Sequence, residues 1–121
     1  MTDRSLKPCP KTPNCVSSLA PEDDRKHHIP AITFSGDPAA ALEAVLGAIG
    51  TLERTRIVEQ TDGYVHAVSA SKVFRFKDDL EVLIGDGRID VRSAARMGSY
   101  DFDVNRKRVE AFSDEVRNRL A

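Results

Sequence analysis

Hydrophobic residues change their spacing along this chain, and the spacing predicts which segments are helical. Residues 38–50 read PAAALEAVLGAIG, and their larger apolar side chains recur at helical intervals: Leu42, Val45, Leu46 and Ile49. Asp37 is a favoured helix-capping residue, Pro38 suits the first helical position, and Gly50 is typical of a helix end. We therefore expect a first helix over these residues.

The C-terminal region carries the strongest helical pattern, over about residues 103–120. Its apolar positions are Val109, Phe112, Val116 and Leu120, and its basic residues lie mostly elsewhere around the helix. Asp101 or Asp103 would serve as the N-cap, and the closing basic residues suit the negative end of the helix dipole. The pattern predicts a second helix.

Between the two helices, apolar and polar residues alternate, which is typical of strands with one buried face. The predicted strands cover about residues 51–60, 64–72, 72–85 and 88–94, and a shorter one lies in 29–36. In the second of these strands, Val65, Ala67 and Ser69 alternate with Tyr64, His66, Val68 and Ala70, so one face is the more apolar. Phe74 and Phe76 share a face, as do Leu80, Val82 and Ile84, and Ile89 and Val91 point inward. Turn signals at Asp62-Gly63 and at residues 85–87 make neighbouring strands antiparallel.

Residues 1–28 show neither period, and their prolines and charged residues predict an irregular arm. The fold class we expect is therefore α+β. After the Pro-rich arm, the order β-α-β-β-β-β-α gives a twisted antiparallel sheet of about four to five strands. Both helices should pack on one face of it. With no repeat or linker, residues 1–121 should form a single domain, with an arm (1–28) and a core (29–121).

Composition narrows the classes of function. Lys and Arg number 18 against 19 Asp and Glu, so the net charge of −1 gives no overall attraction for nucleic acid or an anionic membrane. No window approaches the ~20 apolar residues of a transmembrane helix, and the opening MTDRSLKP lacks an apolar signal segment. These features predict a soluble, cytoplasmic protein that binds neither nucleic acid nor membranes.

Two stretches carry a resemblance to a known family. The first is PKTPNCVSS at residues 10–18; the second is FKDDL at 76–80, followed by SAARMGSYDFDVNRKR at 93–108. They are similar to the signatures of the family catalogued as domain of unknown function 1499. Ala95 stands where that family tends to have Ser, and Asp103 where it tends to have Gly. The resemblance implies one domain, and it brings no established activity, substrate or cofactor.

The strand-to-helix corner at residues 93–108 is the first candidate site. A helix N-terminus offers unpaired N–H groups, and Arg96, Arg106, Ser93 and Ser99 would complete an anion cradle. In the more ordinary interpretation, Asp101 and Asp103 cap the helix and pair with the arginines, while Asn105 bridges backbone groups. Carboxylates standing where an anion would bind favour this second interpretation.

The arm is the second candidate site, because both cysteines of the chain lie in it. Cys9, Cys15, His27 and His28 could form a zinc site, although their spacing is poor for one. Alternatively, Cys9 and Cys15 form a disulfide, which needs an oxidising compartment. In the favoured interpretation, Cys15 packs as a small apolar side chain, and Ser17 and Ser18 bond the local backbone.

Two further groups of residues have mainly structural interpretations. Asp78 and Asp79 are adjacent on a strand, so they point to opposite faces; one would cap a turn and the other pair with an arginine. His66 is more typical of a half-buried sheet histidine than of a ligand or of the base for a catalytic cysteine at position 15.

The function we favour from the sequence is a non-enzymatic binding or interaction module for a small anionic ligand or partner, with no cofactor, metal or catalytic residue. Its ligand-binding residues would be Arg96, Ser93, Ser99, Asn105, Arg106, Cys15 and Ser17. The alternative is an enzyme that acts on an anionic substrate through the Cys15 thiol or the corner of Arg96 and Arg106.

Overall fold

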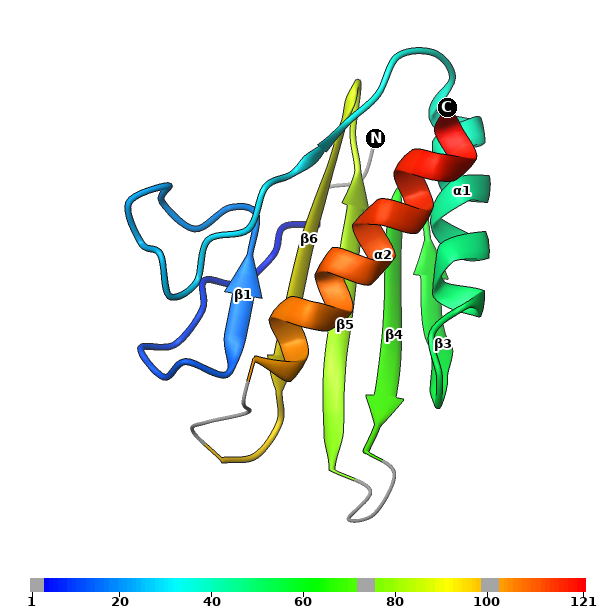
Figure 1. Ribbon diagram of the computed structural model, residues 1–121. Coiled ribbons are helices and arrows are strands. Elements are labelled where there is room, and N and C mark those ends of the chain that lie inside the picture. The colour runs from blue at the N-terminus through cyan, green and yellow to red at the C-terminus, as the bar shows by residue number, and fades with distance from the viewer. Residues whose placement is uncertain (1–3, 72–75, 99–102) are drawn as a thin grey trace.

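A computed structural model describes residues 4–71, 76–98 and 103–121 of the chain (Figure 1). In chain order the elements are β1 (Cys15–Ser17), β2 (Ile32–Thr33), α1 (Pro38–Gly50), β3 (Thr55–Thr61), β4 (Tyr64–Ala70), β5 (Lys77–Ile84), β6 (Arg88–Ala95) and α2 (Val104–Leu120). An antiparallel sheet with two helices confirms the predicted α+β class. The prediction for Phe74 lies outside the described residues.

The sheet runs in the order β1-β6-β5-β4-β3, and β2 also pairs with β6. From β3 to β6 each strand is antiparallel to the next in sequence, as the short turns predicted. The arm differs from its prediction, because Cys15–Ser17 pairs with residues 92–94 of β6 and adds a strand. Three residues are too few to show a period, so sequence could not reveal this strand.

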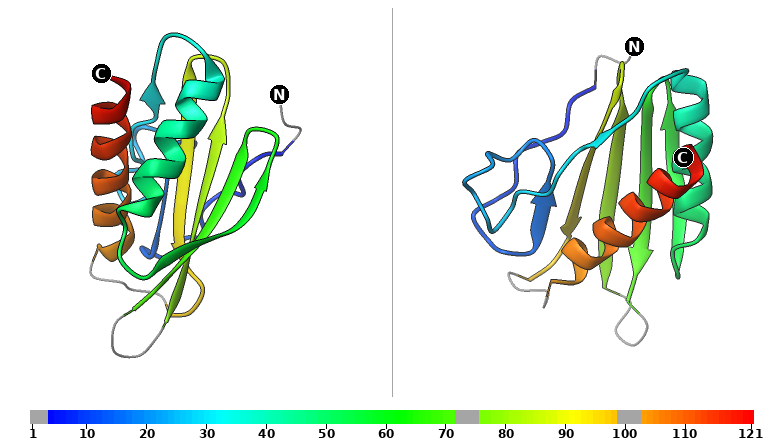
Figure 2. Two further views of the ribbon diagram at one scale, coloured as in Figure 1. Left: turned by 90° about the vertical axis from the view of Figure 1, so that its right-hand side faces the viewer. Right: turned by 45° about the horizontal axis from the view of Figure 1, so that its top comes forward.

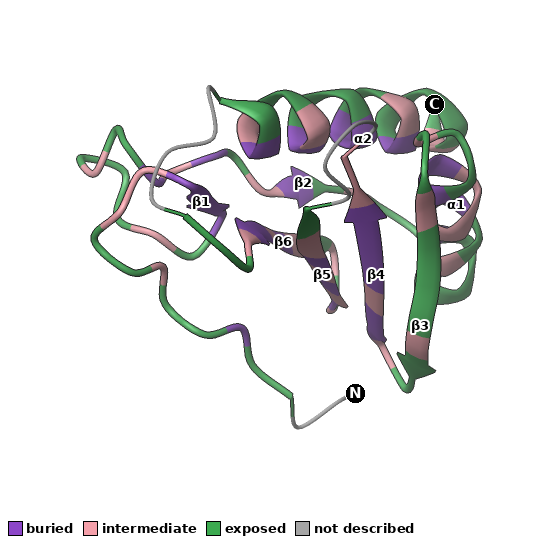
Figure 3. Cartoon of the chain, turned by 90° about the horizontal axis from the view of Figure 1, so that it is seen from below, coloured by how far each residue is buried: buried purple, intermediate pink, exposed green. Residues whose placement is uncertain are grey.

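Both helices lie on one face of the sheet, as predicted, and we call this the helix face (Figure 2). The sides of α1 and α2 that face the sheet are buried, together with alternate residues of the strands (Figure 3). The core includes Val45, Ile49, Val65, Leu80, Val82, Ile89, Val91, Val109, Phe112 and Val116. One continuous apolar cluster therefore holds the two layers together.

The two helices begin differently. Asp37 caps α1 as predicted, and its Oδ1 accepts a hydrogen bond of 2.9 Å from the Ala39 N–H. Asp103 precedes α2 in a left-handed conformation, with φ of 63°, and its side chain makes no capping hydrogen bond. Glycine adopts this conformation without strain, so a glycine would suit this position better than an aspartate does. Asp101, the other predicted cap, lies outside the described residues.

The opposite face of the sheet, which we call the outer face, is crossed by residues 4–9, which we call the strap. Figures 2 and 3 show the start of the chain on the side away from the helices. Leu6 is 7% exposed, and the Arg4 guanidinium lies 4.4 Å from the centre of the Tyr64 ring. The strap therefore covers part of the face that the helices leave open.

Candidate functional site

The two stretches that carry the family resemblance meet in the fold. Cys15 of β1 is the register partner of Ala94 in β6, and the Asn14 carbonyl accepts a 3.0 Å hydrogen bond from the Ala95 N–H. Cys15 therefore lies one strand away from the end of β6 that carries Arg96. Residues around these two positions form one continuous region.

Beneath this junction, on the helix face, lies a buried polar network. Ser93 and Asn105 are almost completely buried, and the Ser93 hydroxyl donates to Asn105 Oδ1 at 2.5 Å. Arg108 donates to the same oxygen at 3.0 Å and to Asp78 Oδ2 at 2.8 Å. These contacts fasten the start of α2 to β5 and β6, so Ser93 and Asn105 support the corner from within.

Arg106 fastens the arm. Its guanidinium donates to three backbone carbonyls, those of His28 at 3.0 Å and of Arg25 and Lys26 at 3.1 Å each. A guanidinium aimed at carbonyl groups in this way stabilises the arm against α2. Arg106 and Arg96 therefore have separate sets of partners, and the anion cradle we expected to include both stays a prediction.

The cysteines pair with each other as a Cys9–Cys15 disulfide, so the described chain has no free cysteine. The favoured interpretation, a free Cys15, is wrong in this respect, although its side chain is fully buried as expected. Ser17 is buried beside it, and its hydroxyl accepts from the Leu19 N–H at 3.1 Å, the local bonding we predicted. The disulfide ties the strap to β1.

The histidines of the arm make structural hydrogen bonds. His27 contacts Asp24 Oδ2 and the Thr12 carbonyl at 2.8 Å each, and His28 contacts the Ala20 carbonyl at 3.0 Å. Across residues 4–71, 76–98 and 103–121, no group of three or more His, Cys, Asp or Glu residues is placed to hold a metal ion.

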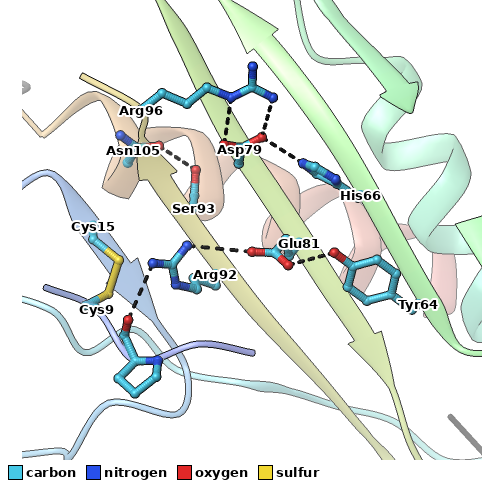
Figure 4. Close-up of polar contacts among 11 residues, drawn as sticks. Cys9, Cys15, Tyr64, His66, Asp79, Glu81, Arg92, Ser93, Arg96 and Asn105 are labelled. Carbon is cyan, nitrogen blue, oxygen red and sulfur yellow. Dashed lines mark hydrogen bonds and ion pairs between the residues drawn. A yellow bond between two sulfur atoms is a disulfide. The ribbon is translucent and has the colours of Figure 1, made fainter. Parts of the chain in front are cut away.

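On the outer face, His66, Asp79 and Arg96 form a line across β4, β5 and the end of β6, which we call the Asp79 row (Figure 4). Arg96 donates to Asp79 through Nε at 2.9 Å and Nη2 at 2.8 Å, and His66 Nε2 lies 2.7 Å from Asp79 Oδ1. The Arg96 side chain is 44% exposed, against 23% for Asp79. This row is open to solvent at the arginine end.

A second line on the same face, the Glu81 row, consists of Tyr64, Glu81 and Arg92 (Figure 4). The Tyr64 hydroxyl donates to Glu81 Oε2 at 2.6 Å, and Arg92 Nη1 lies 3.6 Å from Glu81 Oε1. Arg92 Nη2 also donates to the Pro8 carbonyl of the strap at 3.4 Å. The Arg92 side chain is only 12% exposed, so the arginine end of the Glu81 row is covered, whereas the arginine end of the Asp79 row is open.

The two rows also differ in their electrostatics. The Arg96 guanidinium lowers the pKa of Asp79, aided by the hydrogen bond from His66 and opposed by burial. In the other row, burial raises the pKa of Tyr64, and its hydrogen bond to Glu81 raises it further. Asp79 is therefore held as a carboxylate, and Tyr64 as a neutral phenol.

A comparison with known families agrees with the resemblance in the sequence. The model of a family described as a protein of unknown function, DUF1499, matches residues 5–116. The chain belongs to the DUF1499 family. No curated protein matches the chain. In the part of this DUF1499 domain that the structure describes, no helix is long and apolar enough to cross a membrane.

The sequence anticipated only part of this site. Asp78 and Asp79 do face opposite sides of β5, and both pair with arginines, so the expectation that one caps a turn is wrong. His66 is half-buried on the sheet as predicted. Ser99 lies outside the described residues, so its role in the DUF1499 domain stays a prediction.

Sequence reasoning missed the Glu81 row entirely. A signal for part of it was present, because Ile84 and Ile89 flank the turn at residues 85–87 and are register partners. Three residues away from the turn on each strand, Glu81 therefore lies opposite Arg92, and the two form a cross-strand pair of opposite charge.

Proposed function

We propose that this DUF1499 domain is a non-enzymatic binding module that takes a small anionic ligand, through its carboxylate or phosphate group, at the Arg96 end of the outer face. The observation that carries the proposal is the exposed guanidinium of Arg96, held in one orientation by its two hydrogen bonds to Asp79. A preorganised arginine is well suited to bind carboxylate or phosphate.

Lys77 strengthens the attraction for an anion. The backbone N–H of Arg96 donates to the Lys77 carbonyl at 3.0 Å, so Arg96, just after β6, lies beside Lys77 at the start of β5. Lys77 precedes Asp79 by two residues on β5, which places its exposed side chain on the same face. Two like charges at adjacent positions repel each other, and a bound anion would relieve that repulsion.

The other predicted ligand-binding residues enter this proposal as supports. Ser93 and Asn105 hold the end of β6 against α2, Arg106 holds the arm, and Cys15 and Ser17 hold β1. Ser99 is retained as a proposed contact on sequence grounds alone.

The alternative function, an enzyme, receives less support. In the disulfide, Cys15 has no thiol and its side chain is fully buried. The Arg106 guanidinium donates to backbone carbonyls of the arm, so it is engaged there and not at the corner where Arg96 lies. Catalysis through the Cys15 thiol would first require reduction of the disulfide.

The cellular compartment is linked to the same cysteines. A cytoplasmic protein would hold Cys9 and Cys15 as thiols, whereas a disulfide persists in an oxidising compartment. A count of thiols in protein denatured directly from the cell, with alkylation to trap them, would distinguish a cytoplasmic location from an oxidising one.

Thermal unfolding in increasing inorganic phosphate or acetate tests the binding proposal, because a ligand that binds only the folded state raises the melting temperature. Phosphate also stabilises proteins without binding a specific site, so the test is a comparison of variants. Arg88→Gln is a matched control: Arg88 lies on the outer face of β6, the strand that leads to Arg96, and it also pairs with a carboxylate, that of Asp90.

We expect the wild type and Arg88→Gln to gain the same stability from the anion, and Arg96→Gln to gain less. The relative response to phosphate and acetate would show which group is preferred. An equal gain in all three proteins would refute binding at Arg96.

A further inference from the structure

The strap and the body of the domain are joined through a disulfide whose two cysteines differ in burial. Cys15 is fully buried in β1, whereas Cys9, at the end of the strap, is half-buried. A cavity of about 180 Å³ lies beside Cys9, lined in part by Leu6, Lys7 and Leu19. Cys9 is therefore the cysteine that a reductant would reach more readily.

The part of the arm that follows Cys9 in the chain is held by hydrogen bonds that do not depend on the disulfide. The Ser17 N–H donates to the His27 carbonyl at 2.7 Å, and the Ser18 N–H donates to the Val91 carbonyl at 2.9 Å. His27 also contacts the Thr12 carbonyl at 2.8 Å. Breaking the disulfide would leave residues 12–18 in place.

Apart from the disulfide, the strap is attached through Leu6, Arg4 and the Pro8 carbonyl, and the Arg4 guanidinium also lies over the Tyr64 ring. Leu6 is buried, and the exposed side chain of Arg4 pairs with the half-buried side chain of Glu59, an interaction close to solvent that contributes little to stability. The Arg92 bond to the Pro8 carbonyl is long at 3.4 Å, and Arg92 Nε is buried without a hydrogen-bond partner among the described residues. Release of the strap would let water reach this nitrogen, which favours release.

We propose that Cys9–Cys15 is a reversible redox site, and that its reduction by a dithiol releases the strap and opens the Glu81 row to solvent. The open and covered rows would then form one continuous polar face. This inference does not depend on anion binding at Arg96, because the strap and its contacts lie on the other row.

The reaction balances as a thiol–disulfide exchange. A thiolate of the dithiol attacks Cys9 Sγ, the Cys9–Cys15 bond breaks, and Cys15 leaves as a thiolate. The second thiol of the reductant then displaces Cys9 and closes the reductant's own disulfide. The domain gains two electrons and two protons, one on each cysteine, and the dithiol loses the same number.

The size of the effect follows from the loop that the bond closes. The two cysteines are six positions apart, and the chain-entropy model for a loop this short gives a change of roughly fifty-fold in the opening equilibrium. We therefore expect at least about a tenfold rise in the rate at which water reaches the outer face.

The test is solution NMR of the whole chain before and after dithiothreitol under native conditions, with a thiol count on each sample. Two measurements report on the strap: the heteronuclear NOE of its backbone amides, and the exchange of the Arg92 Nε–H with water. We expect two new thiols, NOE values typical of a flexible segment for the strap, and Arg92 Nε–H exchange at least about ten times faster. Residues 15–17 should stay ordered.

The Cys9→Ser, Cys15→Ser double variant is the control. It should show the released strap without reductant and should not respond to dithiothreitol. Three results would each overturn the proposal: a disulfide that resists native reduction, a strap that stays ordered once two thiols are present, or loss of the whole fold on reduction or in the double variant. Loss of the whole fold would show that the disulfide stabilises the entire domain and does not only attach the strap.

Discussion

The helix face and the outer face of the sheet are built from alternating residues of the same strands, yet they are covered in different ways. On β4 to β6, inward residues such as Val65, Leu80 and Val91 are fully buried under two helices. Outward residues form the Asp79 and Glu81 rows, and the short strap crosses the Glu81 row. The helix face stabilises the fold by apolar burial, whereas the outer face keeps charged groups paired and near solvent.

This difference separates stability from recognition. Loss of buried apolar surface should unfold the domain, while changes on the outer face should leave the fold intact and alter what the surface can bind. Four predictions on stability test the comparison, from the largest expected effect to the smallest.

Phe112→Ala should have the largest effect. Phe112 is fully buried between α2 and the sheet, and removal of its ring leaves a cavity, so we expect a loss of about 3 to 5 kcal/mol in the free energy of unfolding. Chemical denaturation measures the loss. Leu19→Ala is the control, because Leu19 is 51% exposed and should lose less than about 0.5 kcal/mol. Similar losses for the two variants would contradict the assignment of the core.

Asn105→Ala tests the polar network within the helix face. Without the amide, the buried hydroxyl of Ser93 loses its hydrogen-bond partner, and we expect a loss of about 2 kcal/mol. Asn118→Ala, at an exposed position on the same helix, should be almost neutral. An Asn105 variant as stable as the Asn118 variant would show that the network contributes nothing.

Asp79→Asn should cost about 1 kcal/mol at neutral pH, because its exposed partner Arg96 is screened by water. The pKa of Asp79 is lowered in the folded state, so its charge stabilises the fold above its unfolded pKa of about 3.9. This contribution is lost as the pH falls through the lower, folded pKa. The difference in stability between wild type and variant should therefore shrink in acid; a difference that does not change with pH would count against the ion pair.

Tyr64→Phe should have the smallest effect at neutral pH, about 0.5 to 1 kcal/mol, since it removes one hydrogen bond to Glu81. The pKa of Tyr64 is raised in the folded state, so its contribution is complete below the unfolded pKa of about 10. It is lost as the pH rises through the folded pKa. Absorbance titration of the wild type should show a late-ionising phenol, and the variant should lack it. An unchanged titration curve would show that another group was observed.

The parts of the fold that sequence predicted well depend on neighbours in the chain. The helix over 38–50 was predicted at both ends, because its cap, its proline and its apolar period all lie within the segment. The antiparallel pairing of β3 with β4 and of β5 with β6 followed from turn signals in the same way.

The parts that sequence did not predict depend on contacts between distant residues. The pairing of β1 with β6 joins Cys15 to Ala94, and nothing local to either residue specifies it. The link between His66 and Asp79 depends on the register between β4 and β5, whose connection contains no two-residue turn signal. Exposed charged residues such as Arg96 follow no hydrophobic pattern, so their ion-pair partners can be identified only once the register of the strands is known.

The measurement that tests the proposed function most directly is a map of amide chemical shifts in the wild-type protein as inorganic phosphate is added at constant ionic strength. We predict that the largest changes fall on the outer face, at Arg96 and its neighbours Lys77, Asp79 and His66, and that they saturate. Changes centred on Arg106 and the arm, or changes that never saturate, would contradict an anion site at the open end of the Asp79 row.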